Sequence, residues 1–393
     1  MAAVRSTAAP DDFVGAAELW PLARGELKGA LRIIAHAHHL FDLEGGSPGD
    51  RGETLMPVRL GYGLITCQRY PGDPRSDVDL YREALDLATE AEGLGFDSVW
   101  TSEHHFADDA YAPALFPLSA AIAARTTSIA IGTGLVLAPL HRPLRLAEDA
   151  AVVDLISVGR FVLGLGLGWL EWEFEALEVP FHERARRMVQ AIETCRQAWG
   201  DGLVEDAGVA VFPKPARPGG PPIWLGGHRE PAVRRAAALA DGWMAGEPDV
   251  ETFGVQAGWL ADELDRGGRS TEAVEVAGYW PVFVGRDPER AWEQVRSHLH
   301  YMQWKYDDSE RARGRLGPLP LPPPLDQASE SALRASVICG TPGQVASRVR
   351  ELADIAGPRF TFIARLYYPG MDPATMREST RLFAERVIPA VRA

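Results

Sequence analysis

The sequence is poor in cysteine, in basic residues relative to acidic ones, and in long hydrophobic runs. Its three cysteines, Cys67, Cys195 and Cys339, lie far apart, which gives no disulfide framework or zinc spacing and fits a reducing cytoplasm. Lys and Arg total 40 against 54 for Asp and Glu, and this net charge of −14 argues against a nucleic-acid partner. No uninterrupted apolar stretch approaches the ~20 residues of a transmembrane helix, so we expect no membrane span.

The N-terminal part of the chain shows neither a targeting signal nor a metal motif. The stretch MAAVRSTAAPDDF has two aspartates where a signal peptide needs an apolar core, so we expect a cytoplasmic protein. Residues 1–57 precede the first expected strand and form an N-terminal extension. Within it, His36, His38 and His39 do not share one helix face, and we attribute them to packing or a dimer contact rather than to a metal.

From residue 58 onward, short β-branched runs alternate with amphipathic segments. Eight apolar runs predict strands, and their continuous apolar character is typical of a parallel sheet covered on both faces. The expected strands are 58–65, 96–105, 128–137, 159–168, 221–227, 242–246, 274–285 and 359–368. The expected helices are 77–94, 114–126, 143–156, 182–198, 231–240, 250–267, 287–300, 341–355 and 372–387. Thr341 is the expected N-cap of its helix, with Pro342 at the first helical position.

Eight strand–helix units close most economically into a barrel. We therefore predict an α/β fold, a (β/α)8 TIM barrel over residues 58–393, with insertions. The alternative, a doubly wound open sheet, would need a glycine-rich fingerprint after the first strand, and GYGLITCQ does not supply one. The main insertion, residues 301–330, contains RGRLGPLPLPPPLD, which cannot be helix or central strand. It is either a lid over the site or a plain surface excursion.

The stretch TSEHHF places Glu103, His104 and His105 at the end of the second strand, on the catalytic rim of a barrel. Side chains alternate along a strand, so His104 points opposite to Glu103 and His105, which disfavours one metal held by all three. An imidazole exchanges protons near neutral pH, and His104 is therefore the candidate acid or base. The alternative is that three polar residues merely cap a strand.

Small residues gather at the ends of the next two strands. Thr133 and Gly134 leave the third strand end without bulky side chains, and Gly164, Gly166 and Gly168 alternate on the fourth strand. We interpret this as an open surface on which a planar ring can lie. Close packing inside the barrel is the alternative interpretation.

The stretch WLGGHREPAV joins the fifth expected strand to a helix through Gly226 and Gly227. Amides at a helix N-terminus bind phosphate where glycine permits close approach, and Arg229 would add a charge-assisted contact. A simple strand–helix loop is the alternative.

Four stretches in the same order resemble the bacterial luciferase-like superfamily of flavin-dependent monooxygenases and deazaflavin-dependent oxidoreductases. They are WTSEHHF (100–106), residues 129–169 including IAIGTGLVLAPLHRPLR and FVLGLGLGW, PPIWLGGHREPAVRRAAALADGW (221–243) and CGTPGQVASRVREL (339–352). The resemblance extends from about residue 58 to residue 390. It implies a (β/α)8 barrel that binds the isoalloxazine ring at the C-terminal strand ends, and a homodimer.

The resemblance also assigns roles to individual residues. His104 corresponds to the active-site histidine of luciferase, with Glu103 or His105 orienting it or holding the loop. The ring would lie over a non-prolyl cis peptide, which we place at Thr133–Gly134, in a cavity flanked by Trp169 and Trp243. The residues assigned to the cofactor are Thr133, Gly134, Gly164, Gly166, Gly168, Trp169, Gly226, Gly227, His228 and Arg229, the last four at the phosphate.

Two departures from luciferase concern the phosphate. Gly166 and Leu167 stand where luciferase has a reactive cysteine and a phosphate-binding arginine, and His228 replaces the usual small hydroxyl residue. Arg229 is the candidate substitute for the missing arginine.

Three hypotheses for function follow from the resemblance. The first is a two-component monooxygenase: reduced FMN from an NAD(P)H-dependent flavin reductase and O2 oxygenate a small organic substrate, by hydroxylation or Baeyer–Villiger chemistry. The second is hydride transfer with a deazaflavin coenzyme on the same barrel. The third is a non-catalytic flavin-binding partner subunit. The close match at EHHF favours FMN, and His104 speaks against the third hypothesis.

Overall fold

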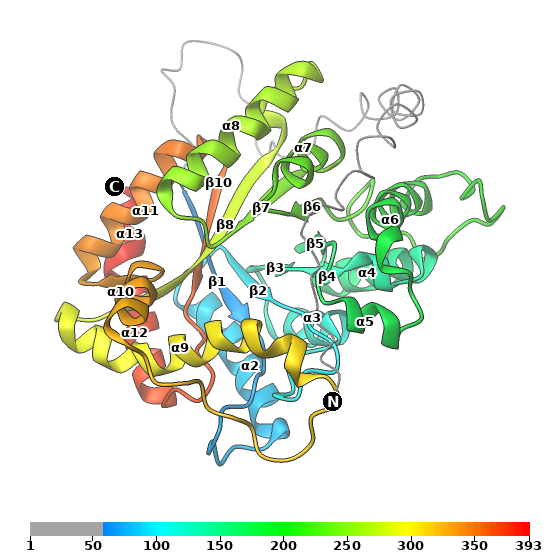
Figure 1. Ribbon diagram of the computed structural model, residues 1–393. Helices are drawn as coiled ribbons and strands as arrows, with labels where there is room; N and C mark the ends of the chain where they lie inside the picture. Colours follow the sequence, from blue (N-terminus) through cyan, green and yellow to red (C-terminus); the bar gives the residue numbers. More distant parts are fainter. Residues whose placement is uncertain (1–57) are drawn as a thin grey trace, which may run out of the picture. The chain divides into compact units, whose positions relative to one another are not determined.

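The computed structural model describes residues 58–393, and the predicted N-terminal extension, with His36, His38 and His39, lies outside the described residues. In the described part, eight parallel strands form a closed barrel (Figure 1). They are β1 (Arg59–Ile65), β2 (Ser98–Thr101), β3 (Ala130–Thr133), β5 (Phe161–Gly166), β6 (Ile223–Gly226), β7 (Gly242–Gly246), β8 (Glu275–Val284) and β10 (Phe360–Arg365). The last strand, β10, pairs in parallel with both β1 and β8, which closes the barrel. The predicted TIM barrel is therefore confirmed.

Helices alternate with these strands and surround the barrel (Figure 1). They are α2 (Asp77–Gly93), α3 (Leu115–Arg125), α4 (Pro143–Ser157), α5 (Glu171–Ala176), α6 (Arg184–Trp199), α7 (Glu230–Leu239), α8 (Val250–Arg266), α9 (Pro288–Ala312), α10 (Gln327–Ala335), α11 (Pro342–Ala356), α12 (Pro373–Leu382) and α13 (Ile388–Arg392). Two short strands, β4 (Val136–Leu137) and β9 (Ile338–Gly340), extend the sheet outside the barrel ring. Between residues 58 and 393, no helix is long and apolar enough to cross a membrane.

Local sequence signals explain where several helices begin. Thr341 caps α11 and forms a capping box with Gln344, and Pro342 occupies the first turn, as predicted. Ser76 and Asp79 form the same reciprocal pair at the start of α2. Because a capping box satisfies two otherwise unpaired amides, it fixes the first turn of each helix.

Helix α9 runs to Ala312, twelve residues beyond its predicted end at 300. Tyr301, Met302, Lys305, Asp308 and Ala312 are buried at helical spacing, so the buried face of the helix continues although two of these residues are charged. The proline-rich stretch 313–326 contains neither helix nor strand, as its composition predicted. The first part of the expected insertion is therefore ordered helix.

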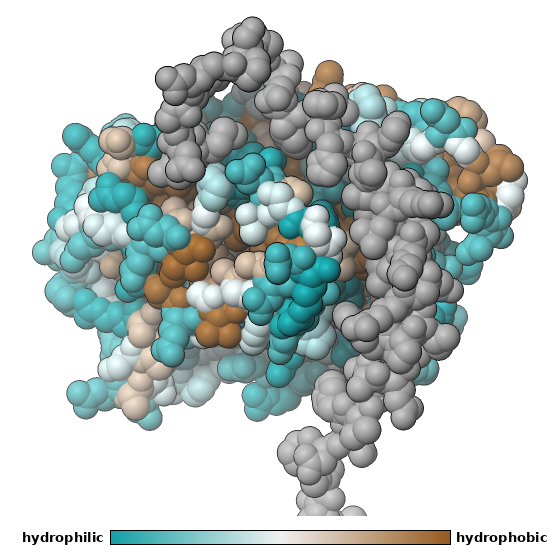
Figure 2. All heavy atoms as spheres, turned by 90° about the horizontal axis from the view of Figure 1, so that it is seen from above, coloured by the Kyte–Doolittle hydropathy of each residue, from teal (hydrophilic) through white to brown (hydrophobic). Residues whose placement is uncertain are grey.

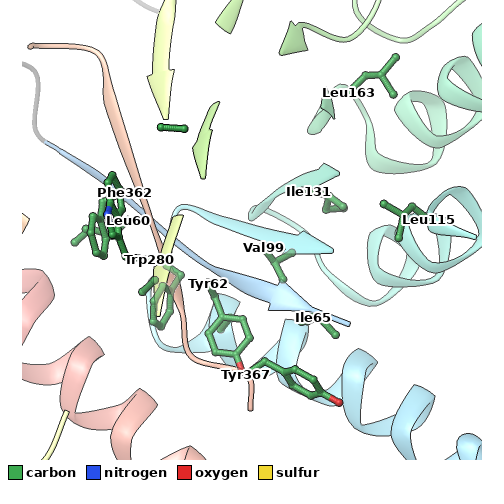
Figure 3. Close-up of a cluster of buried hydrophobic side chains, with 14 of the residues drawn as sticks. Leu60, Tyr62, Ile65, Val99, Leu115, Ile131, Leu163, Trp280, Phe362 and Tyr367 are labelled. Atoms are coloured by element: carbon green, nitrogen blue, oxygen red, sulfur yellow. The ribbon is translucent and has the colours of Figure 1, made fainter. Parts of the chain in front are cut away.

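Two layers of apolar side chains hold the barrel. The outer layer lies between the strands and the helices and includes Leu60, Val99, Ile131, Leu163 and Phe362 (Figure 3). On the molecular face shown in Figure 2, hydrophobic residues form small groups bordered by hydrophilic ones.

The second layer fills the inside of the barrel. It comprises Leu64, Trp100, Val162, Trp224, Met244, Ala277 and Ile363, with Leu135 and Tyr279 packed against them. The indoles of Trp100 and Trp224 stack with ring centroids 5.1 Å apart. Because these side chains occupy the barrel interior, a ligand site is left to the strand ends, where barrel enzymes have their active sites.

Candidate active site

His104 follows the end of β2 and lies in an aromatic setting. Its side chain is 13% exposed, and the rings of Tyr111, Tyr306 and Trp169 meet it edge-on, with centroid distances of 4.9, 5.8 and 6.1 Å. His104 Nδ1 lies 3.2 Å from Oε1 of Glu173. An ionised carboxylate can only accept, so Nδ1–H is the donor and Nε2 is left as the nitrogen that can exchange a proton with a ligand.

Glu173 is a site residue that the sequence analysis missed. It lies on α5, is completely buried, and its Oε1 also accepts the backbone N–H of His105 at 2.7 Å. The same carboxylate therefore orients the His104 ring and fixes the loop that carries it. In the sequence, Glu173 stands between Glu171 and Glu175, which are both exposed, and nothing in the spacing distinguishes it from them.

Glu103 and His105 pair with each other rather than with His104, as predicted, although β2 ends at Thr101 and all three residues lie in the loop after it. Glu103 Oε1 accepts from the backbone N–H of Leu137 at 2.9 Å and lies 3.3 Å from His105 Nε2. Burial raises the pKa of Glu103, but the hydrogen bond from His105 and the nearby imidazole of His141 outweigh it and lower the pKa to about 2. Glu103 thus ties the end of β2 to β4, and this geometry supports the loop-holding role of the pair.

The glycines of β5 and β6 make room for the protein's own atoms. A Cβ on Gly164 would lie 1.9 Å from the backbone oxygen of Thr133, and one on Gly226 would lie 2.0 Å from Leu135 Cδ1. A Cβ on Gly166 would likewise lie 3.2 Å from Leu135 Cβ. The expected open glycine surface is therefore wrong, and close packing explains these glycines. Gly164, Gly166 and Gly226 can act on a ligand only through Leu135 and the β3 backbone.

Two other expectations need correction. The non-prolyl cis peptide after β3 joins Gly134 to Leu135, one residue later than predicted. Trp243 does not flank the mouth: it is completely buried on the outer side of β7, where its ring stacks on Phe253 of α8 at 5.9 Å. Trp169, in contrast, is 45% exposed beside His104, and Gly168 before it has a φ of +74°, the left-handed conformation that favours glycine.

The loop between β6 and α7 presents the predicted phosphate residues. His228 and Arg229 are exposed, and Arg229 is the N-cap of α7 without a side-chain capping bond. A Cβ on Gly227 would lie 2.4 Å from Ala232 Cβ, so glycine lets the loop approach the helix closely. An uncapped helix N-terminus beside an arginine has the donors that a phosphate group requires.

The C-terminal half of α9 covers the site. A cavity of about 20 Å³ adjoins His104, and Lys305, Tyr306, Ser309 and Ala312 form one of its walls. This volume holds roughly one water molecule. The helical part of the expected insertion is therefore part of the site, and sequence analysis missed Tyr306 because it ended the helix too early.

A closed (β/α)8 barrel with a histidine–carboxylate pair at its C-terminal strand ends has the arrangement of the barrel enzymes. Among residues 58–393, no group of three His, Cys, Asp or Glu side chains is placed to hold a metal ion. The site therefore offers acid–base chemistry.

Residues 60–358 match the family model described as luciferase-like monooxygenase, and the chain belongs to this family. The resemblance found in the sequence is therefore confirmed. Members include flavin-dependent monooxygenases and F420-dependent oxidoreductases.

Individual relatives fall on both sides of this division. An F420-dependent glucose-6-phosphate dehydrogenase from Nakamurella multipartita is 28% identical over 366 residues, covering 86% of this chain and 98% of the relative. The oxygenase component of a flavin-dependent trigonelline monooxygenase from Acinetobacter baylyi is 33% identical over 178 residues, covering 42% of this chain and 48% of the relative. The crystal structure of monooxygenase RslO1 from Streptomyces bottropensis has a TM-score of 0.66 and 26% identity, covering 84% of this chain and 99% of that one.

Proposed function

We propose that this protein is the oxygenase component of a two-component flavin-dependent monooxygenase, which uses reduced FMN and O2 to oxygenate a small organic substrate. Reduced FMN would supply the electrons that activate O2. The observation that carries the proposal is the enclosed, aromatic setting of His104, whose side chain lines the cavity while Glu173 holds Nδ1. A water-poor setting suits a reaction in which activated oxygen must not be lost to solvent.

The donors of the site fit FMN. Gly227, His228 and Arg229 would hold the phosphate at the uncapped start of α7. Thr133, Gly134 and Trp169 would contact the ring. The lack of a side chain leaves space for Leu135 and the β3 backbone at Gly164, Gly166 and Gly226, and for Phe174 at Gly168. His104 would move the proton, and the Glu103–His105 pair would hold its loop.

One observation favours a second function, hydride transfer with a deazaflavin coenzyme. The F420-dependent relative aligns over nearly its whole length, whereas the trigonelline monooxygenase aligns over about half. In this reading His104 is the acid or base for the substrate hydroxyl or carbonyl, and no oxygen is activated.

Anaerobic titration with both reduced cofactors distinguishes the two functions. We expect reduced FMN to bind with low-micromolar affinity or better, and the oxygenase reading requires NAD(P)H-dependent O2 consumption when a flavin reductase is added. Tight binding of reduced F420 together with no binding of reduced FMN would refute the proposed function and establish the second one. The Arg229→Gln variant checks the phosphate contact, because it should weaken FMN binding far more than riboflavin binding.

The reductase partner and the homodimer belong to the same proposal. The trigonelline relative is named as an oxygenase component, which supports a separate reductase. Sedimentation of the purified chain, alone and with a flavin reductase, measures both associations. A monomer at micromolar concentration would contradict the homodimer.

A further inference from the structure

Arg365 is the last residue of β10 and points into the mouth of the barrel. Phe360, Phe362 and Ala364 belong to the outer core, whereas Ile363 belongs to the layer inside the barrel. Because side chains alternate along a strand, Arg365 shares the inner side with Ile363 and stands one step closer to the mouth. Its side chain is only 2% exposed.

The guanidinium of Arg365 is only half satisfied. Nη1 donates to Oε1 of Glu247 at 2.7 Å, whereas Nε and Nη2 are buried without a hydrogen-bond partner. Leaving a buried donor unpaired costs roughly 1–3 kcal/mol, and more for a charged group. Buried arginines are therefore normally paired on every side, and an open edge requires an explanation.

The unpaired donors Nε and Nη2, which form the open edge of the guanidinium, are suited to one kind of ligand. Nε and Nη2 carry two parallel N–H groups whose spacing matches the two oxygens of a carboxylate, which binds such an edge in a bidentate manner. Glu247 does not compete for this edge, because it binds Nη1 and its side chain is 26% exposed to water. The pair with Glu247 instead fixes the plane of the guanidinium.

The ring of Tyr306 lies between Arg365 and His104, the candidate acid or base. Its Cζ is 5.9 Å from the centre of the Tyr306 ring, and the Tyr306 and His104 ring centroids are 5.8 Å apart. The Tyr306 hydroxyl lies 3.3 Å from that of Tyr111, so the aromatic wall between the two sites is continuous. A ligand held at Arg365 would therefore extend along Tyr306 toward His104.

We propose that Arg365 is the anion-recognition residue of the substrate site and that the substrate is a small carboxylate. This inference rests on the proposed location of the active site but not on the identity of the cofactor. The carboxylate would accept from Nε and Nη2, the apolar body would pack on Tyr306 and Tyr111, and the reacting carbon would lie on the His104 side.

The test uses the full chain without cofactor and two matched pairs of probes, benzoate with benzamide and cyclohexanecarboxylate with its amide. Tryptophan fluorescence follows binding. We expect the acids to bind at least tenfold more tightly than the amides, because only they form the charge-assisted pair. Equal binding of acids and amides would overturn the proposal without any variant.

Arg365→Lys is the decisive variant, because lysine keeps the charge beside Glu247 but lacks the two-donor edge. It should weaken benzoate binding about tenfold or more and leave benzamide binding unchanged. Arg377→Lys, which alters the ion pair between Arg377 of α12 and Glu90 of α2, is the matched control and should change the binding of neither benzoate nor benzamide.

Two results from Arg365→Lys would contradict the proposal. Unchanged benzoate binding with a lower melting temperature would make Arg365 a purely structural residue. Loss of reduced-FMN or reduced-F420 binding with unchanged benzoate binding would assign the open edge to the cofactor. Failure of the two-component monooxygenase assay, in contrast, would leave the benzoate result intact, so the two proposals fail separately.

Discussion

At the scale of single residues, the site depends on a carboxylate that comes from a distant part of the chain. Glu173 lies 69 positions after His104 and binds its Nδ1. Glu173→Gln should lower kcat by about tenfold or more with little change in KM, because the ring loses its fixed orientation, whereas His104→Gln should lower kcat by roughly 100-fold or more. Steady-state kinetics with the cofactor identified by titration measures both.

Glu171→Gln is the control for this prediction, because Glu171 is exposed on the same short helix. Its kcat should equal that of the unaltered protein. If Glu173→Gln and Glu171→Gln behave alike, Glu173 does not position His104.

Glu103 makes a pH-dependent contribution to stability. Its pKa falls from 4.5 to about 2 in the folded protein, so its contribution is fully present above pH ~4.5 and is lost as the pH falls toward 2. Burial lowers the pKa of His105, but the hydrogen bond and charge of Glu103 outweigh burial and raise this pKa above 6.5 in the folded protein. The ionic part of the pairing is therefore lost as the pH rises through the raised pKa of His105.

Glu103→Gln should therefore reduce the free energy of unfolding most between about pH 5 and 7, by up to about 3 kcal/mol, and much less at pH 3. Urea unfolding at these pH values measures the difference. A constant difference between pH 3 and pH 7 would show that the charge of Glu103 is not involved.

The TSEHHF stretch was enough to predict that His104 points away from Glu103 and His105, although these residues lie in the loop after β2 and not in the strand. Glu173 was not predictable, because its burial depends on how α5 packs against the loop after β2. The open glycine surface was misread for a similar reason. The sequence shows that Gly164 and Gly226 lack side chains, but only the packing shows that Thr133 and Leu135 use the space.

At the scale of elements, Leu135 and the glycines of β5 and β6 form one packing unit. Gly226→Ala should destabilise the fold by roughly 1–3 kcal/mol, because its Cβ would meet a Leu135 methyl group. Gly164→Ala should cost more, because its Cβ would meet backbone that cannot rotate away. Urea denaturation compares the two variants.

The double variant Leu135→Ala/Gly226→Ala is the control. It should recover part of the stability lost in Gly226→Ala, because the new methyl group occupies space that the leucine vacates. No recovery would mean that the two side chains do not share this space.

The C-terminal half of α9 is fastened to the loop after β2 by buried charges. Lys305 Nζ lies 2.5 Å from Asp108 and 3.3 Å from Asp308, and Arg315 binds the same two carboxylates. Lys305→Met should cost about 3 kcal/mol locally, because it leaves buried carboxylates short of a partner. Hydrogen exchange should then accelerate over residues 301–312.

Arg311→Gln is the matched control, because Arg311 is 72% exposed and 3.9 Å from Asp308. Its exchange should match that of the unaltered chain. If hydrogen exchange in Lys305→Met also matches that of the unaltered chain, the buried ion pairs do not hold α9 over the site.

The start of α9 was predictable and its end was not. Asp287 and Pro288 mark the N-terminus through capping and a fixed φ angle. At the other end, polar residues such as Lys305 and Asp308 occupy buried positions, so a hydrophobicity pattern breaks although the helix continues. Where charged residues are buried as ion pairs, the helical periodicity of buried positions cannot be recognised from hydrophobicity alone.

At the scale of the whole molecule, ion pairs that stabilise the barrel lie at the start of the strands, and the candidate active site lies at their C-terminal ends. At the start of the strands, the buried Glu275 of β8 pairs with Arg59 of β1 and, at 3.0 Å, with Arg359 beside β10. Glu275→Gln should lower the free energy of unfolding by about 2–4 kcal/mol, because the ion pairs that this buried carboxylate makes with Arg59 and Arg359 across the closing strands are lost. The kcat of the folded protein should not change, because the active site lies at the opposite strand ends.

The closed barrel itself was predictable because eight apolar strands separated by helices leave few other arrangements. Strand β7 matches its predicted range of 242–246, whereas β2 ends at Thr101, four residues before its predicted end at 105. The mouth was less predictable than the barrel, since it is built by segments of irregular length whose packing depends on many distant residues.

The stacked indoles of Trp100 and Trp224 lie inside the barrel and block its central axis. Nothing the size of a substrate can pass through its floor. We therefore expect ligands to enter and leave on the side of the C-terminal strand ends. If a cofactor binds beneath the substrate, the product must leave before the cofactor can.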